Sequence, residues 1–406
     1  MKNISSNKQS GAVSLFIVVF FMLLITVVTV SFLRLMTADQ QQSSNNDLSQ
    51  SAYDSAQAGV EDAKRTLLSY KQYCSTSTVA ECAIAGNGSH VASDVCNAAL
   101  ANNIGVAATS KTSEVMIQQS ATDNAKLLDQ AYTCVTIQLE TKDYIGNVAA
   151  NETQLVPLIS DDSFDRVRIE WFSREDVASN AVSLAGIGGS GQPLYTAGNW
   201  PINRPSLLRA QLIQVATNGF KIADFDTVNG PQSNAATMFL YPTSQIGISE
   251  REMTTYDQRK VSSTDNPNPK DALTTPTPVS CKADLSAGGF ACATTLVLPQ
   301  AVGAGSNNRT GFLRLTPLYN ATHFRVTLWN GAVNPANPNA LFKDVQPIVD
   351  STGRANDLFR RIESRVDLFD TTFPYPEAAI DVTGNFCKDF AVTDTQYIAG
   401  TSGCTP

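Results

Sequence analysis

The sequence predicts an α+β fold: a long N-terminal transmembrane and amphipathic α-helix, followed by a large, mainly antiparallel, β-rich exported head. Three observations support this prediction. A continuous apolar segment lies near the amino terminus, and apolar residues then recur at helical spacing up to about residue 72. The remaining chain contains short alternating segments that are separated by Gly, Pro and Asn. A length of 406 residues suffices for a sizeable core and for two or three structural units.

The apolar segment is long enough to cross a bilayer. No charged residue lies between Lys8 and Arg34, and the stretch 12–33 is nearly all Val, Ile, Leu, Phe and Met. As a helix it spans roughly 33 Å, which matches a hydrocarbon core. A secretory signal peptide has a shorter apolar region and a small-residue cleavage site, which is missing here. The basic leader, with Lys2 and Lys8, favours a cytoplasmic amino terminus. We therefore expect a single span with the head outside.

A stripe of apolar residues continues the helix beyond the span. Its members recur every three or four residues, and the charged residues lie off the stripe. No proline occurs before Pro157, so a helix from about residue 13 to 72 is predicted, roughly 90 Å long. Residues 37–46 are polar on all sides, and fraying is expected there. The stripe consists of Leu48, Ala52, Ala56, Val60, Ala63, Leu67 and Tyr70.

Short alternating segments predict antiparallel β structure in the head. Residues 134–139 and 166–171 show the alternation well, and a helix is expected around 113–130. The Thr-, Pro- and Asn-rich segment 254–280 is predicted to be a loop or linker that separates a β-rich lobe of residues 74–253 from a second of residues 281–406. Further strand candidates are 207–216, 235–241, 292–299, 311–317, 323–329 and 364–369.

The cysteines indicate an exported domain with disulfides. All eight lie beyond residue 73, and none forms a CxxC pair, which argues against zinc ribbons and thioredoxin-like centres. An even number of cysteines is typical of disulfide-bonded exported proteins. Cys281–Cys292 and Cys387–Cys404 are plausible local pairs, although eight cysteines allow many other connectivities. The disulfide candidates are Cys74, Cys82, Cys96, Cys134, Cys281, Cys292, Cys387 and Cys404.

Composition and motifs disfavour several functions. A net charge of −8 argues against binding to nucleic-acid phosphates, and two histidines exclude a multi-histidine metal site. No P-loop, HExxH or GxSxG motif occurs. Residues 186–191 match GxGxxG formally, but Pro193 follows where a dinucleotide fold needs a helix. His323 lies at a strand position, where a structural role is expected. The chain is thus predicted not to be an enzyme and to use no cofactor or metal.

Two segments of the helix carry a resemblance to a known family. Gly11 stands between the basic leader and the apolar helix, which resembles the site after which prepilin peptidases cut. Residues 51–63 resemble the AxxAxAGxxDA segment of PilX-like minor pilins, and they are similar to K-class pseudopilins of type II secretion. Together these features cover residues 9–65. The second segment reads Ser51-Ala52-Tyr53-Asp54-Ser55-Ala56-Gln57-Ala58-Gly59-Val60-Glu61-Asp62-Ala63.

The resemblance implies roles for particular residues. The leader 1–11 would be removed after Gly11, and Ala12 would become a methylated amino terminus at the start of a helix 12–73. Major pilins carry Glu at the fifth position after the cut, whereas this chain has Phe16, which disfavours a major pilin. Residues of the apolar face would pack against other pilin subunits, namely Phe16, Phe20, Leu24 and Val28. Four residues would dock the helix on its own head, namely Ala52, Ala56, Val60 and Ala63.

The resemblance implies a minor pilin or pseudopilin of a type IV pilus-like filament that acts in assembly, priming or tip adhesion. Its expected partners are other pilin subunits, a prepilin peptidase, the membrane and an unidentified surface ligand. Its expected location is the cytoplasmic membrane, and after assembly the cell surface or a pilus. The alternative is a single-span, membrane-anchored surface adhesin that does not polymerise. A membrane-stalked carbohydrate-active enzyme would need two converging carboxylates, and no sequence pattern nominates such a pair.

Overall fold

A computed structural model of the chain describes residues 10–74, 114–117, 130–184, 199–216, 235–244, 252–254, 276–303, 309–333 and 339–369. The chain forms two compact units. Unit 1 comprises Met1–Gln138 and Ile348–Ser364, and unit 2 comprises Leu139–Pro347 and Arg365–Pro406. Three strands, β2, β13 and β14, contain residues of both units, so the polypeptide passes from one unit to the other within regular structure.

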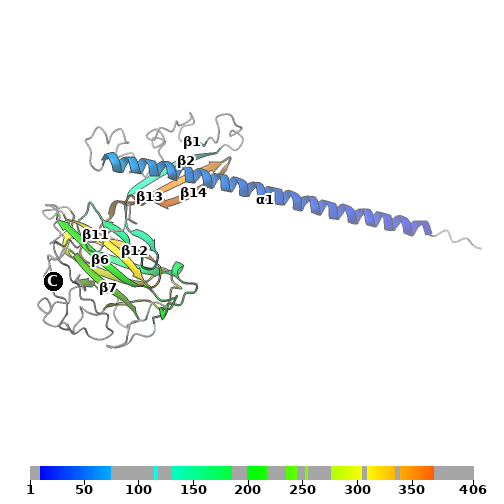
Figure 1. Ribbon diagram of the computed structural model, residues 1–406. Coiled ribbons are helices and arrows are strands. Elements are labelled where there is room, and N and C mark those ends of the chain that lie inside the picture. The colour runs from blue at the N-terminus through cyan, green and yellow to red at the C-terminus, as the bar shows by residue number, and fades with distance from the viewer. Residues whose placement is uncertain are drawn as a thin grey trace, which may run out of the picture. The chain divides into compact units, whose positions relative to one another are not determined.

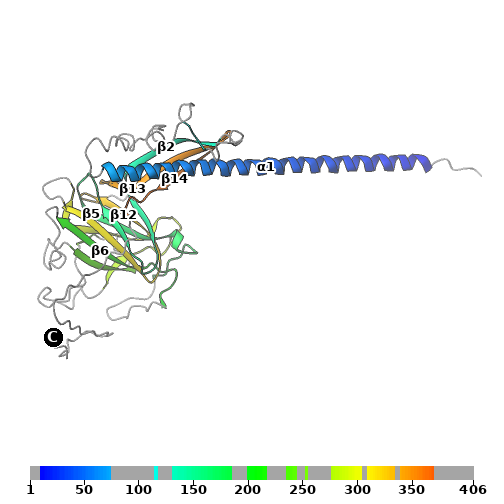
Figure 2. The ribbon, with the colours of Figure 1, turned by 45° about the horizontal axis from the view of Figure 1, so that its top comes forward.

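Unit 1 contains one long helix and a four-stranded sheet. The helix α1 runs without interruption over Ser10–Cys74, a length of 65 residues. In both views its second half lies along the sheet, while its first half extends beyond it (Figures 1 and 2). The strand order is β1-β2-β13-β14. These strands are β1 (Val115–Met116), β2 (Gln130–Thr141), β13 (Phe342–Ala355) and β14 (Leu358–Arg365).

Helix α1 agrees closely with the predicted helix of residues 13–72, but it shows no break in the polar segment. Residues 37–46 are helical and exposed, although fraying was expected there. The helix expected around residues 113–130 is contradicted where residues 115–116 and 130 form strands, and residues 118–129 lie outside the described residues. Val115 pairs with Tyr132 in an antiparallel ladder, and β2 begins at Gln130. A short apolar run such as residues 115–117 cannot be assigned to helix or strand from periodicity alone.

The described residues of unit 2 form two five-stranded sheets that enclose a hydrophobic core. The orders are β3-β12-β5-β10-β8 and β4-β11-β6-β7-β9. Neighbouring strands are antiparallel except for the parallel pairs β10–β8 and β7–β9. The strands are β3 (Tyr144–Val148), β4 (Gln154–Leu158), β5 (Phe164–Ser173), β6 (Leu207–Ala216), β7 (Ala235–Thr243), β8 (Glu252–Thr254), β9 (Thr277–Ser280), β10 (Phe290–Val302), β11 (Arg309–Leu318) and β12 (Thr322–Trp329), and a 3₁₀ turn, η2 (Arg174–Asp176), follows β5.

The core of unit 2 follows from the alternation of its strands. Side chains of successive residues point to opposite faces of a sheet, so every second residue of a strand faces the other sheet. Trp171 and Phe324 on the first sheet and Leu208 and Leu313 on the second belong to one cluster of fully buried side chains. The figures show these sheets as two layers, with β5 and β12 in one and β6 in the other.

The structure does not divide at residues 254–280 into the two expected lobes. The first sheet pairs β5 with β10, and the second pairs β6 with β11, so both sheets combine strands from both sides of that segment. A low-complexity composition shows where a chain avoids the core, but it does not show which distant strands pair. The strand expected at residues 364–369 lies earlier in the chain: β14 covers Leu358–Arg365.

One of the two expected local disulfides lies within the described residues. Cys281 and Cys292 are bonded and also pair as an antiparallel bridge, next to β9 of one sheet and in β10 of the other. Cys134 on β2 is disulfide-bonded as well. Cys74 is the last residue of α1. The remaining candidates, Cys82, Cys96, Cys387 and Cys404, lie outside the described residues.

Candidate functional site

The second half of α1 buries one face on the sheet of unit 1. The four residues that the sequence nominated for packing on the head are almost entirely inaccessible: Ala52 and Ala56 are 0% exposed, Ala63 is 1% and Val60 is 3%. Leu67 continues the same face at 0%. Intervals of three and four residues place these side chains on one side of the helix. Most of them are small, so the backbone of the helix can approach the sheet closely.

Two glycines, one on each side, make this approach possible. A Cβ atom at Gly59 of α1 would collide with Oγ of Ser351 and would lie 3.1 Å from both Cγ of Tyr132 and Cγ2 of Val135. A Cβ atom at Gly353 of β13 would collide with backbone atoms of α1. Glycine normally weakens a helix by about 1 kcal/mol relative to alanine, so its presence at position 59 has a packing reason.

A partly buried hydrogen bond fixes the helix on the sheet beside the glycines. The hydroxyl of Tyr132 on β2 donates to Oδ2 of Asp62 on α1 at 2.9 Å. Burial, together with this hydrogen bond and the negative charge of Asp62, raises the pKa of Tyr132. Asp62 also lies 3.4 Å from Nη1 of Arg65, one turn along the helix. The phenol therefore stays protonated, and its hydrogen bond to Asp62 fixes the orientation of the helix about its own axis.

A second polar contact lies at the edge strand β14. Nε of Arg360 donates to Oγ of Ser49, at the start of the docked half of α1. On the neighbouring strand β13, Arg354 forms an ion pair with Glu114 at 2.7 Å. These contacts and the Tyr132–Asp62 hydrogen bond tie the helix and the strands of unit 1 to one another.

The docked segment gives a physical account of the motif in residues 51–63. Ala52, Ala56, Gly59 and Ala63 face the sheet, and Asp62 accepts the hydrogen bond from the sheet. Sequence reasoning identified the alanines but assigned no role to Gly59. A glycine within an apolar helical stripe was the signal for a close approach.

The first half of α1 has a different surface. Its large apolar side chains from Leu15 to Met36 are exposed within the structure, including the four residues expected to serve in assembly. Phe16 is 73% exposed. Gly11 and Ala12 lie in the first turns of the helix, which begins at Ser10. The four residues expected to serve in assembly are Phe16, Phe20, Leu24 and Val28, all at least 47% exposed.

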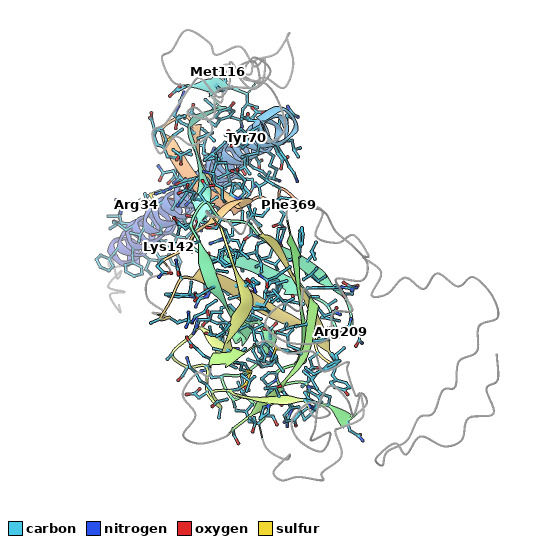
Figure 3. The ribbon with its side chains drawn as sticks, turned by 90° about the vertical axis from the view of Figure 1, so that its left-hand side faces the viewer. Arg34, Tyr70, Met116, Lys142, Arg209 and Phe369 are labelled. Atoms are coloured by element: carbon cyan, nitrogen blue, oxygen red, sulfur yellow. A yellow bond between two sulfur atoms is a disulfide. The ribbon has the colours of Figure 1, made fainter. Side chains whose placement is uncertain are left out.

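This half of the helix is suited to an apolar environment. Among the described residues, α1 is the one helix long and apolar enough to cross a membrane. Its hydroxyl groups donate to carbonyl oxygens one turn earlier: Thr26 to Leu23 at 2.8 Å and Ser31 to Val27 at 2.8 Å. Such bonds satisfy polar groups that lipid cannot. In Figure 3, Arg34 marks the end of the apolar half and Tyr70 the docked end.

The described residues contain no group of three or more His, Cys, Asp or Glu side chains arranged to hold a metal ion. Comparisons of the chain with family models, with curated proteins and with solved structures find no match. Helix α1, with one exposed apolar half and one docked half, is therefore the candidate functional site.

Proposed function

We propose that the chain is a minor pilin or pseudopilin subunit of a type IV pilus-like filament. The observation that carries this proposal is the division of α1: a half that is apolar on all sides and exposed continues directly into a half that small residues dock on the chain's own sheet. A subunit of this design presents its first half to lipid before assembly and to partner helices afterwards. The sheet of unit 1 follows the movement of the helix.

The apolar half can exchange one environment for the other at small cost. Lipid tails are as apolar as Leu side chains, so association of spanning helices depends on packing and not on the hydrophobic effect. Helix α1 has no charged residue between Ser10 and Leu33, and the hydroxyls of Thr26, Thr29 and Ser31 already bond to the helix backbone. These three hydroxyls need no new partner when neighbouring helices replace lipid.

The docked half supports the transmission of force from the helix to the sheet of unit 1. Close contact through Gly59 and Gly353, together with the hydrogen bond from Tyr132 to Asp62, resists rotation and sliding of the helix on its sheet. A simple membrane anchor needs no such contact, because a flexible juxtamembrane linker would serve it equally well. This tight docking favours the filament subunit over the alternative of an anchored adhesin.

Phe16 supports a minor position in the filament. A carboxylate at the fifth residue after the cut would pair with the amino terminus of a neighbouring subunit, but Phe16 offers an apolar ring. A repeating shaft subunit would need that partner at every step. We therefore propose assembly, priming or a tip role for this chain, with the head supplying any contact to a surface ligand.

The proposal is tested by following the amino terminus. The full chain is expressed with and without a prepilin peptidase, and the mature terminus is identified by mass spectrometry. We expect a product that begins at Ala12, that requires the peptidase and that is lost in Gly11→Leu. A chain that retains its leader under all conditions would support the non-polymerising, membrane-anchored surface protein instead.

Assembly is tested separately with a photoreactive residue. The probe is placed at Phe20 in the apolar half or, as a matched control, at Gln57, which is exposed on the docked half. We expect cross-links to other pilin subunits from position 20 only when the filament machinery is present. Equal cross-linking with and without the machinery would contradict a role in the filament.

A further inference from the structure

The outermost strands of a β-sheet carry backbone N–H and C=O groups without a ladder partner, and they attract a strand of another chain unless the protein blunts them. Six strands end the sheets within the described residues, namely β1, β14, β3, β8, β4 and β9. β1 and β8 are blunted by their length of two and three residues. β4 and β9 contain Pro157 and Pro278, which have no N–H group to donate.

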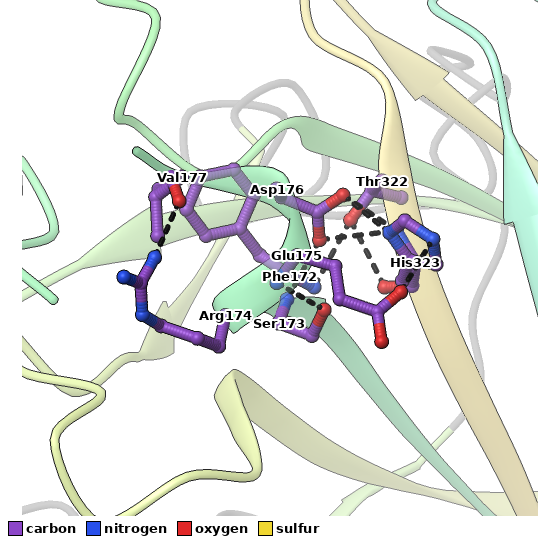
Figure 4. Close-up of polar contacts among 8 residues, drawn as sticks. All are labelled: Phe172, Ser173, Arg174, Glu175, Asp176, Val177, Thr322 and His323. Carbon is purple, nitrogen blue, oxygen red and sulfur yellow. Dashed lines mark hydrogen bonds and ion pairs between the residues drawn. The ribbon is translucent and has the colours of Figure 1, made fainter. Parts of the chain in front are cut away.

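Side chains close the edge of β3. The carboxamide of Gln346 bonds to both backbone groups of Ile145: its Oε1 accepts from the N–H at 3.0 Å, and its Nε2 donates to the carbonyl oxygen at 2.8 Å. A glutamine side chain thus takes the place of a further strand. The end of β5 is closed in a similar way, because the N–H of Phe172 donates to Oγ1 of Thr322 at 3.0 Å (Figure 4).

The edge strand β14 has none of these protections. It is eight residues long, it contains neither Pro nor Gly, and β13 is its one neighbour in the sheet of unit 1. The N–H of Val366, which continues the strand, donates to the carbonyl oxygen of Pro347 on β13. Successive N–H groups of a strand point to opposite sides, so those of Phe359, Arg361 and Glu363 point to the open edge.

The charges of β14 have both signs. Like charges on an edge strand repel an incoming strand, but here Arg361 and Glu363 lie two residues apart and share one face of the sheet. Both side chains are exposed. Nε of Arg361 donates to Asp350 on β13 at 2.8 Å, yet the side chain remains 70% exposed and can contact a second carboxylate. A strand that pairs with β14 therefore meets a positive and a negative charge in sequence.

A second copy of β14 supplies the complementary pattern when it runs antiparallel. With Ile362 opposite Ile362, Arg361 of each copy lies opposite Glu363 of the other, and the backbone groups of these residues point to each other. Phe359 then lies opposite Arg365. Opposite charges across a strand pair are favourable, and like charges are unfavourable. A shift by two residues would place Arg361 opposite Arg361 or Glu363 opposite Glu363, so the charges select one register.

We propose that two copies of this chain pair through β14 and join their four-stranded sheets into one continuous sheet. The contact is isologous, with its two-fold axis perpendicular to the sheet at Ile362. This axis reverses the direction of every element that lies along the sheet, including the docked half of α1 (Figure 2). The apolar halves of the two helices then point in opposite directions. The pair therefore links copies in separate membranes or filaments, which goes beyond the assembly of one filament.

The test reverses the charges in the full chain, kept in detergent, which imposes no common direction on the helices. Sedimentation equilibrium measures the dimer. Arg361→Glu brings carboxylates together at both charge pairs, and Glu363→Arg brings guanidinium groups together. We expect the dissociation constant to rise at least about 10-fold in each variant. The matched control is Glu61→Lys, a charge reversal at an exposed position of α1, which should leave the dimer unchanged.

Mixing the two variants gives the sharpest result. An equimolar mixture of Arg361→Glu and Glu363→Arg restores opposite charges at both pairs, so we expect a heterodimer of about wild-type affinity. A heterodimer also shows that both variants fold. A wild type that stays monomeric at concentrations on the order of 100 μM, or a mixture that associates no better than either variant alone, would overturn the proposal.

Hydrogen exchange distinguishes strand pairing from contact through side chains alone. In the dimer the amides of Phe359, Arg361 and Glu363 bond to the other copy, whereas the amide of Ile362 points to β13. We expect the first three to lose on the order of 10-fold in protection when the wild type is diluted to the monomer, and Ile362 to change little. Equal protection of all four amides before and after dilution would contradict pairing through this edge.

Discussion

Gly353 on β13 lies so close to the carbonyl oxygen of Ala52 on α1 that a Cβ atom at position 353 would overlap it. The same Cβ would collide with the backbone nitrogen of Ala56 and would lie 2.8 Å from the carbonyl carbon of Ser55. These are backbone atoms of a helix, which cannot rotate away as a flexible side chain can. Gly353 therefore sets the distance between the helix and the sheet of unit 1.

The first prediction concerns Gly353→Ala. Because the helix backbone must move to admit a methyl group, we expect unit 1 to lose about 1–3 kcal/mol of stability, the usual cost of overpacking, or more. Hydrogen exchange of peptides from residues 48–68 in the full chain measures the loss. Thr352→Ala is the matched control, since neighbouring residues of a strand point to opposite faces. Unchanged protection of the helix in Gly353→Ala would show that the contact is looser than the structure indicates.

The second prediction concerns whether Gly59→Ala raises or lowers the stability of unit 1. On an exposed helix this change stabilises by about 1 kcal/mol, because alanine is the better helix former. At position 59 we expect destabilisation, since the new Cβ meets Ser351, Tyr132 and Val135. Hydrogen exchange of the same helix peptides shows directly whether the variant is more or less stable than the wild type. Slower exchange in the variant would mean that the helix does not dock closely at this point.

Ser351→Ala should partly rescue Gly59→Ala. The Oγ of Ser351 is the atom nearest to the added Cβ, and it is buried without a hydrogen-bond partner among the described residues. Its removal opens space at the helix and leaves no broken hydrogen bond behind. In a double-mutant cycle we expect a favourable coupling on the order of 0.5–3 kcal/mol. Strict additivity of the two changes would contradict direct contact between the two positions.

The third prediction concerns Tyr132→Phe. The change removes the donor to Asp62 and leaves a half-buried carboxylate with one contact fewer, so we expect a loss of about 1–3 kcal/mol. Urea unfolding of the full chain, followed by hydrogen exchange of α1, measures it. Tyr53→Phe is the control, because Tyr53 lies on the same helix but is 47% exposed. A similar loss in both variants would point to a general effect of removing a hydroxyl.

The hydrogen bond also predicts a pH dependence. Burial raises the pKa of Tyr132 above that of the unfolded chain, so the folded state keeps a proton that the unfolded state loses. The stabilisation is complete below about pH 10 and declines as the pH rises further, by up to about 1.4 kcal/mol per pH unit. Unit 1 of the wild type should therefore loosen at alkaline pH more steeply than Tyr132→Phe. Parallel curves would exclude Tyr132 as the titrating group.

The helix could be predicted from the sequence because its signals are local. An uninterrupted apolar run and an apolar stripe at intervals of three and four lie within one continuous segment, and both predicted ends fall within a few residues of Ser10 and Cys74. The strand β6 was similarly clear, because one alternating segment flanked by turn residues matches its bounds, Leu207–Ala216. The buried face of α1 could also be predicted, since helical geometry places Ala52, Ala56 and Ala63 together.

The partner of that face could not be predicted. Tyr132 is 70 residues from Asp62 in the sequence, and no local pattern records such a contact. Strand β13 was missed for a related reason. Phe342 and Val345 belong to the core of unit 2, whereas Gly353 packs against α1, so the strand has no single alternation along its length. The expected division into two lobes was wrong because strands on either side of residues 254–280 pair with one another, and such long-range pairing leaves no local pattern in the sequence.

The last prediction concerns the apolar half of α1. The double substitution Phe20→Lys and Leu24→Lys places two charges on one face in the middle of the span, at a cost of about 2.5–3.5 kcal/mol each for insertion. We expect the chain to leave the membrane fraction after alkaline extraction. The matched control is Gln40→Lys with Ser44→Lys, which has the same spacing in the exposed polar segment beyond the span and should remain membrane-bound. Each single lysine should have a smaller effect, because the rest of the segment from Leu15 to Leu33 stays uncharged. Retention of the Phe20/Leu24 double variant in the membrane would mean that another part of the chain supplies the attachment, and α1 would lose its role as the membrane-spanning segment.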